Sequence, residues 1–290
     1  MHPPPRDPIS SRQPIESRRP SRFSVLPSVR QSVLGWSVIA ALHLGLVASL
    51  PAQSTVSPPR NIRVKVTVNG VPVGATPRLG AHTLAFHRYG GNAAPLTTDA
   101  LTTQATGSTL LVCVGRGDLS AFSLPRDNKG NSPYQQLGSA HPYTLWNSSG
   151  TALYTFPSAA GGTSHTFTTD TPPGDEITMA VVEVTTGGVI KDYQWNEVLS
   201  DLPTTSANVT TTGPATLVAF WWGDAGVDGN KTAQPDNGFV VIDSLLDAGA
   251  LVQCAVATKE VTAAGTYNVT WTATPRQGAQ LWLVAVQHAL

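Results

Sequence analysis

The residues best suited to bind a ligand lie at the end of an apolar run, where two tryptophans lead into a loop of acids and amides. The loop reads Trp221-Trp-Gly-Asp-Ala-Gly-Val-Asp-Gly-Asn230. An exposed indole face can stack on a sugar ring, while carboxylates and amides beside it bind the sugar hydroxyls. Consecutive strand residues point to opposite faces, so one tryptophan belongs to the core and the other is free to face solvent. We therefore predict a ligand site at Trp222, Asp224, Asp228 and Asn230.

Two other interpretations of this loop stay open. Asp, Asn and Gly dominate turns for reasons of backbone conformation alone, and an ordinary turn is the preferred interpretation. The oxygens of Asp224, Asp228 and Asn230 also suit calcium, although their spacing does not match an EF-hand loop. No other cofactor is expected. A second aromatic and polar cluster, Asp192-Tyr-Gln-Trp-Asn-Glu197, adds Trp195 as a candidate on a surface shared with the Trp222 loop.

The acids and histidines form no recognisable catalytic pattern. Hydrolases that cut polysaccharides need two carboxylates about 5 to 9.5 Å apart, and no strand of this chain carries acids at alternate positions. Glu183 is the most unusual acid, because it ends an apolar row with Met179 and Val181; we expect it to reach solvent at the sheet margin or to pair with a base. The sequence has no Gly-x-Ser-x-Gly motif, and its histidines are too scattered for a zinc site.

Short β-rich runs separated by Gly, Pro, Asn and Thr must position these residues. No stretch shows a sustained apolar period of 3.6, and residues 61–68 alternate apolar and other side chains before an Asn69-Gly70 turn. Residues 109–115 read as a strand buried on both faces. Further strands are expected at residues 121–124, 151–156, 164–169, 176–184, 215–222, 239–244, 251–257, 266–274 and 280–287. The chain is thus predicted to be all-β: a single antiparallel, jelly-roll-like β-sandwich over residues 53–290.

Several aromatic and sulfur side chains are expected in the core of this sandwich. Trp146, Trp271 and Trp282 are assigned to it, the last two because they lie in alternating strands. Cys113 and Cys254 each lie in the middle of an apolar run, where buried free thiols are the preferred interpretation. A disulfide between them is the alternative, since an exported protein meets oxidising conditions.

The N-terminus has the pattern of an export signal. Six arginines precede an apolar run at residues 33–50, and Ala52 offers a small residue for cleavage. Residues 1–52 are therefore predicted to be a basic leader with a signal peptide, or alternatively a retained membrane anchor. The remaining chain has 12 basic and 16 acidic residues, a net charge of −4. Such a surface does not suit nucleic acid, and membrane contact is expected only through an uncleaved signal.

The order of several motifs resembles a known group of proteins. The motifs are Gly107-Ser-Thr-Leu-Leu-Val112, Asp127-Asn-Lys-Gly-Asn131, Ser149-Gly-Thr-Ala-Leu-Tyr154, Ala159-Ala-Gly-Gly162, Glu176-Ile-Thr-Met-Ala-Val-Val-Glu-Val184 and Thr211-Thr-Gly-Pro-Ala-Thr-Leu-Val218. From about residue 107 to the C-terminus, the chain resembles secreted bacterial β-sandwich proteins of unassigned function. The resemblance implies a fold and export. It implies no catalytic residues.

Three function classes follow for an exported sandwich with an exposed loop edge. The preferred one is a non-catalytic secreted, periplasmic or cell-surface protein that binds a ligand such as a carbohydrate. The alternatives are a polysaccharide-acting enzyme, whose acids converge from separate strands, and a purely structural envelope protein. The small number of acids and their wide spacing favour binding over catalysis.

Overall fold

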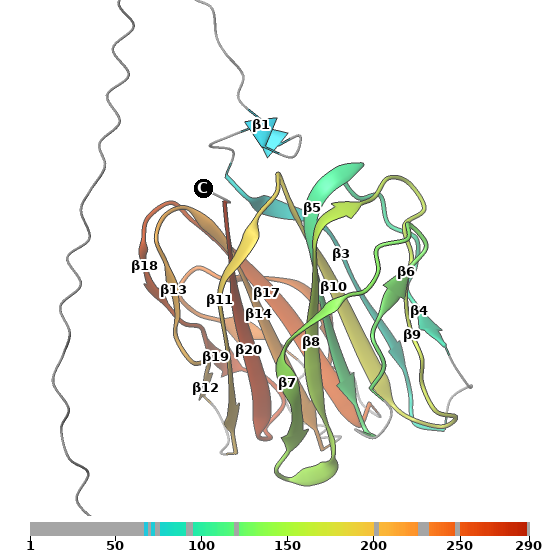
Figure 1. Ribbon diagram of the computed structural model, residues 1–290. Helices are drawn as coiled ribbons and strands as arrows, with labels where there is room; N and C mark the ends of the chain where they lie inside the picture. The colour runs from blue at the N-terminus through green and yellow to red at the C-terminus, as the bar shows by residue number, and fades with distance from the viewer. Residues whose placement is uncertain are drawn as a thin grey trace, which may run out of the picture. The chain divides into compact units, whose positions relative to one another are not determined.

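The computed structural model describes residues 67–68, 71–72, 76–90, 95–118, 122–199, 203–225, 232–246 and 250–288. Residues Asn61–Leu290 form one compact unit, and the described part of it is all-β, as predicted (Figure 1). The predicted signal segment, residues 1–52, lies outside the described residues. Within those residues, no helix is long and apolar enough to cross a membrane.

Two five-stranded antiparallel sheets form the sandwich. The first sheet has the order β3-β10-β5-β8-β7 and the second has the order β11-β20-β14-β17-β16. Strands of the first sheet are β3 (Arg78–His87), β5 (Thr106–Arg116), β7 (Gln135–Tyr143), β8 (Trp146–Ala160) and β10 (Ile177–Thr185). Strands of the second sheet are β11 (Val189–Val198), β14 (Ala215–Asp224), β16 (Val240–Leu245), β17 (Val252–Val261) and β20 (Ala279–Gln287).

Short strands form four further small sheets. One three-stranded sheet joins β4 (Leu96–Thr97), β9 (Phe167–Thr169) and β6 (Arg126–Asp127), and another joins β12 (Thr204–Thr205), β19 (Thr270–Ala273) and β15 (Gln234–Pro235). Two pairs complete the set: β13 (Val209–Thr211) with β18 (Gly265–Tyr267), and β1 (Thr67–Val68) with β2 (Val71–Pro72). Val68 pairs with Val71, which agrees with the hairpin predicted at this point.

The second half of the chain repeats the strand order of the first. Strands β3, β5, β7, β8 and β10 hold the same places in their sheet as β11, β14, β16, β17 and β20. The order β4-β9-β6 likewise corresponds to β12-β19-β15. In each half, eight corresponding strands are thus divided between a large and a small sheet, as in a jelly roll, and the second half adds the pair β13 and β18. The sandwich consists of two equivalent halves, and this internal repeat was not predicted from the sequence.

Hydrogen bonds in the small sheets follow the same repeat. In the first half, Thr98 donates its backbone N–H to Phe167 O at 2.9 Å, and its hydroxyl accepts the Phe167 N–H at 3.1 Å. In the second half, Ser206 makes the same two contacts with Val269, again at 2.9 and 3.1 Å. Because both threonine and serine carry a hydroxyl, the same local bond pattern is conserved between the halves.

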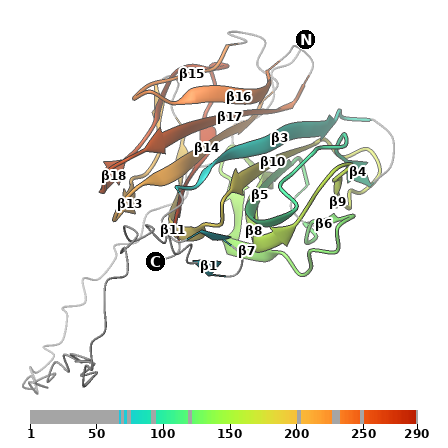
Figure 2. The same cartoon turned by 90° about the horizontal axis from the view of Figure 1, so that it is seen from above.

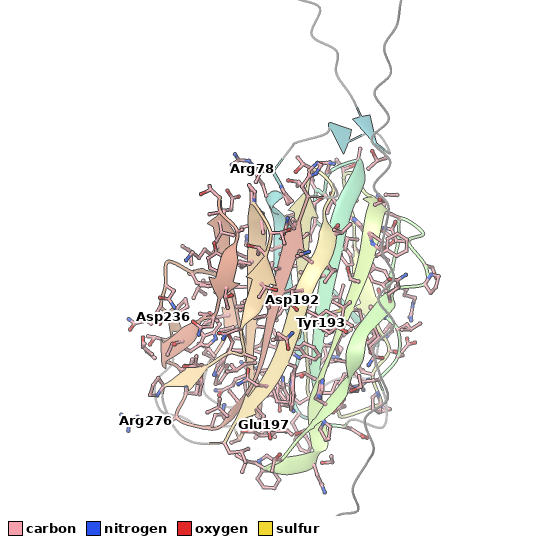
Figure 3. The ribbon with its side chains drawn as sticks, turned by 60° about the vertical axis from the view of Figure 1, so that its left-hand side comes forward. Arg78, Asp192, Tyr193, Glu197, Asp236 and Arg276 are labelled. Atoms are coloured by element: carbon pink, nitrogen blue, oxygen red, sulfur yellow. The ribbon has the colours of Figure 1, made fainter. Side chains whose placement is uncertain are left out.

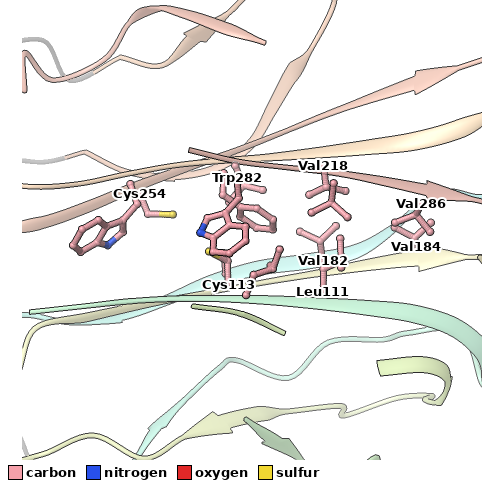
Figure 4. Close-up of a cluster of buried hydrophobic side chains, with 14 of the residues drawn as sticks. Leu111, Cys113, Val182, Val184, Val218, Cys254, Trp282 and Val286 are labelled. Carbon is pink, nitrogen blue, oxygen red and sulfur yellow. The ribbon is translucent and has the colours of Figure 1, made fainter. Parts of the chain in front are cut away.

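Three hydrophobic clusters account for the apolar strands. The central one lies between the large sheets and contains Cys113, Trp222, Cys254 and Trp282 (Figure 4). Each of the other two lies on the outer face of one large sheet, beneath its small sheets (Figure 2). The middle strands are therefore covered on both faces, which explains why they read as continuous apolar runs. Both cysteines are buried free thiols in this structure.

Candidate functional site

Six strand ends meet around a pocket at one end of the sandwich. The pocket has a volume of about 640 Å³, within the usual range for small-ligand sites. Its lining residues lie at or just beyond the ends of β3, β5 and β14, and at or just before the starts of β8, β10 and β17. Antiparallel neighbours run in opposite directions, so the end of one strand lies beside the start of the next. In Figure 3, Arg78, at the start of β3, marks the opposite end of the sandwich.

Backbone hydrogen bonds hold the segments of the first sheet that form the pocket wall. Gly117 donates its N–H to Glu176 O at 2.9 Å, and Gly90 donates its N–H to Gly174 O at 3.1 Å. These bonds continue the strand pairing beyond the ends of β5 and β3. The loop before β10 is therefore fixed between its two neighbours and can position side chains accurately.

Four acids are among the described residues that line the pocket. Asp118 follows β5, Asp175 and Glu176 precede β10, and Asp224 ends β14. No Lys, Arg or His is among the described residues that line it. Asp118 and Asp224 follow matching strands of the two halves, in the sequences Arg116-Gly-Asp118 and Trp222-Gly-Asp224. The described lining is therefore acidic, and each half of the chain contributes an equivalent aspartate to it.

Glu176 is the most buried of these acids. It is 3% exposed, and its Oε1 accepts the Leu251 N–H at 2.8 Å. Its other oxygen, Oε2, is buried without a hydrogen-bond partner in the structure. The net effect of the surroundings is to raise the pKa of Glu176 to about 7. Burial is the main cause and the negative charge of Asp224 acts in the same direction, while the Leu251 and Val252 N–H groups and Arg88 lower the pKa. Glu176 is thus poised to exchange its proton near neutral pH.

The aspartates beside Glu176 also hold protons more tightly than usual. Burial raises the pKa of Asp224, and the charge of Asp175 contributes in the same direction. Burial likewise raises the pKa of Asp175, with a further contribution from Asp118, although Arg116 opposes the shift. Crowding of carboxyl groups with little solvent disfavours their simultaneous ionisation.

Arg116 supports the pocket from inside the protein. Its side chain is fully buried, and Nη2 lies 2.8 Å from Oδ2 of Asp175. The Nε–H donates to the same oxygen at 2.9 Å, and Nη1 donates to the Asp170 carbonyl at 3.1 Å. This ion pair fixes the Asp175 side chain, and with it the segment that carries Glu176.

Two aromatic side chains border the acids. Trp146 and Tyr89 line the pocket and are 57% and 74% exposed. The turn that carries Trp146 is tied to β11, because Thr144 donates its N–H to Oε1 of Glu197 at 2.9 Å and its hydroxyl to Oε2. An exposed ring therefore has a supported position beside buried carboxyl groups. The sequence-based assignment of Trp146 to the core was wrong; that of Trp271 and Trp282 is confirmed.

Trp222 does not belong to this site. It is only 1% exposed, because β14 lies in the middle of its sheet and is covered on both faces. Trp222 points into the central cluster, whereas Trp221 points into the outer one. Its indole lies so close to Gly115 that a Cβ there would be 2.0 Å from Nε1. The prediction of an exposed Trp222 is therefore corrected, since no face of it is free for a sugar.

The other predicted site residues have different outcomes. Asp224 lines the pocket. Trp195 is half-buried on β11, and His141 stacks on its ring with centroids 3.8 Å apart and planes at 6°, so this face is not available for stacking on a sugar. Asp228 and Asn230 lie outside the described residues. Within the described part of the chain, no group of three or more His, Cys, Asp or Glu side chains could hold a metal ion such as calcium.

Glu183 has a structural role. It is 2% exposed and accepts hydrogen bonds from Ala81 N at 3.0 Å, from Gln104 N at 2.7 Å and from the Ser108 hydroxyl. The expectation that it reaches solvent or pairs with a base was wrong, because neutral donors satisfy it inside the protein. Glu176 lies seven positions earlier along the same strand direction, roughly 20 Å away at the strand rise per residue. Glu183 therefore takes no part in the pocket.

Sequence reasoning missed most of the pocket. Asp118, Trp146, Asp175 and Glu176 were not selected, because each lies in a different or apparently ordinary context. A signal was nevertheless present in the sequence. Two apolar runs each follow a Thr-Gly pair and end in a Gly-Asp pair, which is Gly117-Asp118 in the first run and Gly223-Asp224 in the second. Comparing the two strands would have placed two aspartates at equivalent strand ends.

Comparison of the chain with models of protein families, with curated proteins and with solved structures finds no match.

Proposed function

We propose that the protein is exported and binds a carbohydrate in the pocket at the end of the sandwich. Trp146 carries this proposal: its exposed ring borders a pocket that also contains Glu176 and Asp224. An indole face stacks on the apolar face of a sugar, and carboxyl groups accept hydrogen bonds from its hydroxyls. The arginine-rich leader and apolar run support export. The acidic lining disfavours nucleic acid, whose phosphates would be repelled.

Replacing Trp146 with Ala is expected to weaken glycan binding at least about tenfold, since a stacking contact of about 1.4 kcal/mol would be lost. Binding is measured on a glycan array of the mature chain and then by calorimetry with the best ligand. Leu145→Ala is the matched control, because Leu145 is adjacent in the same turn and exposed but does not line the pocket. Equal affinity of the Trp146→Ala variant and the wild type would contradict the proposal, as would an array without signal.

Hydrolysis of a glycosidic bond is the second candidate function, and Glu176 is the observation that favours it. A buried carboxyl group with a pKa of about 7 can serve as a general acid near neutral pH. Glu176 would donate its proton to the departing glycosidic oxygen, while a water adds to the anomeric carbon and loses its proton to Asp224. Release of reducing ends from a polysaccharide panel tests this. Glu176→Gln is expected to lower turnover about 100-fold or more, and absence of turnover in the wild type would exclude this candidate.

A further inference from the structure

We propose that the pocket selects a ligand with a positive charge, an amino sugar with a free amine being the class that fits. This inference rests on the proposed carbohydrate binding and names the chemistry of the ligand. It follows from three features of the pocket: its charge, a buried carboxyl oxygen without a partner and its aromatic border.

Acids outnumber bases among the described residues that line the pocket. Asp118, Asp175, Glu176 and Asp224 line it, and no basic side chain is among its described lining residues. Arg116 is fully buried and already paired with Asp175. Arg88 is not a lining residue, but its positive charge lowers the pKa of Glu176. A cation in the pocket would relieve the repulsion among the carboxylates, whereas an anionic sugar would increase it.

Glu176 provides the second feature. Glu176 is one of the residues that line the pocket, it is only 3% exposed, and its Oε2 is buried without a hydrogen-bond partner. Buried polar atoms in folded proteins are nearly always hydrogen-bonded, so an orphaned carboxyl oxygen indicates a donor that the ligand brings. An ammonium group donates up to three hydrogen bonds and also compensates the charge, which a sugar hydroxyl does not.

The position of the acids and rings provides the third feature. Asp118 and Asp224 lie at equivalent strand ends of the two halves and both line the pocket, so a cation bound there lies near acids from both halves. Trp146 and Tyr89 present exposed rings at the same pocket. Cations are attracted to aromatic faces, and tryptophan is the strongest of these partners. The same rings can stack on the sugar, so one ligand can satisfy both parts of the pocket.

Binding of such a cation is expected to depend on pH. The groups that act on Glu176 are Asp224 from β14, Arg88 after β3 and the backbone N–H groups of Leu251 and Val252, while Asp175, which precedes Glu176 in the same loop, acts on Asp224. Glu176 is neutral below its pKa of about 7 and negative above it. A permanently charged cation should therefore bind more tightly as the pH rises from 5.5 to 8, because the ionised carboxylate attracts it and the protonated form does not.

Calorimetry with ligands of matched length and different charge tests the inference. The probes are oligomers of glucosamine, of N-acetylglucosamine and of glucuronic acid, together with tetramethylammonium as a cation without a sugar. The glucosamine oligomer is expected to bind at least tenfold more tightly than the acetylated one, and the difference should shrink in high salt. Asp224→Asn and Glu176→Gln should each reduce this preference at least threefold. Glu260→Gln, an exposed acid paired with Arg78 at the opposite end, should leave it unchanged.

The outcomes separate this inference from the proposed function. Equal or tighter binding of the acetylated oligomer would overturn the cation preference while carbohydrate binding stands. If tetramethylammonium binds and none of the sugar oligomers does, the cation preference is supported and carbohydrate binding is overturned. Binding of none of the probes would overturn both. The pH series uses the wild-type chain with tetramethylammonium, and affinity that is constant or falls with rising pH would overturn the role of Glu176 even if both variants fail to fold.

Discussion

Replacing Arg116 with Met is expected to lower the free energy of unfolding by about 3–5 kcal/mol, because it leaves a buried carboxylate without its counterion. Arg116 is fully buried and Asp175 is 5% exposed, with 2.8 Å between Nη2 and Oδ2. The substitution also removes the donors to Asp175 Oδ2 and the Asp170 carbonyl. Denaturant unfolding of the two proteins measures the difference in stability.

The exposed ion pair between Arg126 and Asp170 provides the control for this prediction. Arg126 lies 2.8 Å from Asp170, but the two side chains are 50% and 59% exposed. Arg126→Met should therefore cost less than about 1 kcal/mol, as exposed pairs do. Similar losses for the two variants would show that burial of the Arg116 pair does not matter.

The pH dependence of the Arg116→Met variant gives a further check. Arg116 opposes the rise in the pKa of Asp175, so removing it raises that pKa further. A carboxyl whose pKa is higher in the folded than in the unfolded state destabilises the fold above its unfolded pKa, and this penalty disappears as the group is protonated. The deficit of the variant is therefore expected to shrink as the pH falls from 8 toward 4. A deficit independent of pH would contradict this explanation.

Replacing Trp222 with Ala is expected to destabilise the protein by about 3–5 kcal/mol, the range found when a large buried aromatic is removed from a core. Trp222 is 1% exposed and meets the ring of Tyr143 edge-on, with centroids 5.7 Å apart. Truncation leaves a cavity between the two large sheets, where the surrounding strands are held by pairing on both sides. Unfolding in denaturant measures the loss.

Trp146→Ala is the matched comparison, because it removes the same side chain from an exposed position. Its stability is expected to stay within about 0.5 kcal/mol of the wild type, while glycan binding falls. The two tryptophans thus separate a structural from a ligand-binding role. A Trp222→Ala variant as stable as the wild type that no longer binds glycan would restore Trp222 to the site and contradict the structure-based assignment.

The sequence alone was sufficient for the all-β class and for most of the long strands. Apolar runs such as residues 109–115 and 215–222 coincide with β5 and β14, because side-chain alternation and burial are local properties that the sequence records directly. The core positions of Trp271 and Trp282 were predictable for the same reason. Trp222 was misassigned because the number of covered faces depends on a strand's neighbours in the sheet and not on the strand itself.

Only the tertiary structure decided where the pocket lies and which residues form it. Asp118, Trp146, Glu176 and Asp224 are separated by long stretches of sequence, and each lies at the end of a different strand. Their proximity follows from sheet order and from the packing of two equivalent halves, which no local pattern encodes. The pKa of Glu176 depends on this packing as well, because burial and the charge of Asp224 come from parts of the chain that meet only after folding.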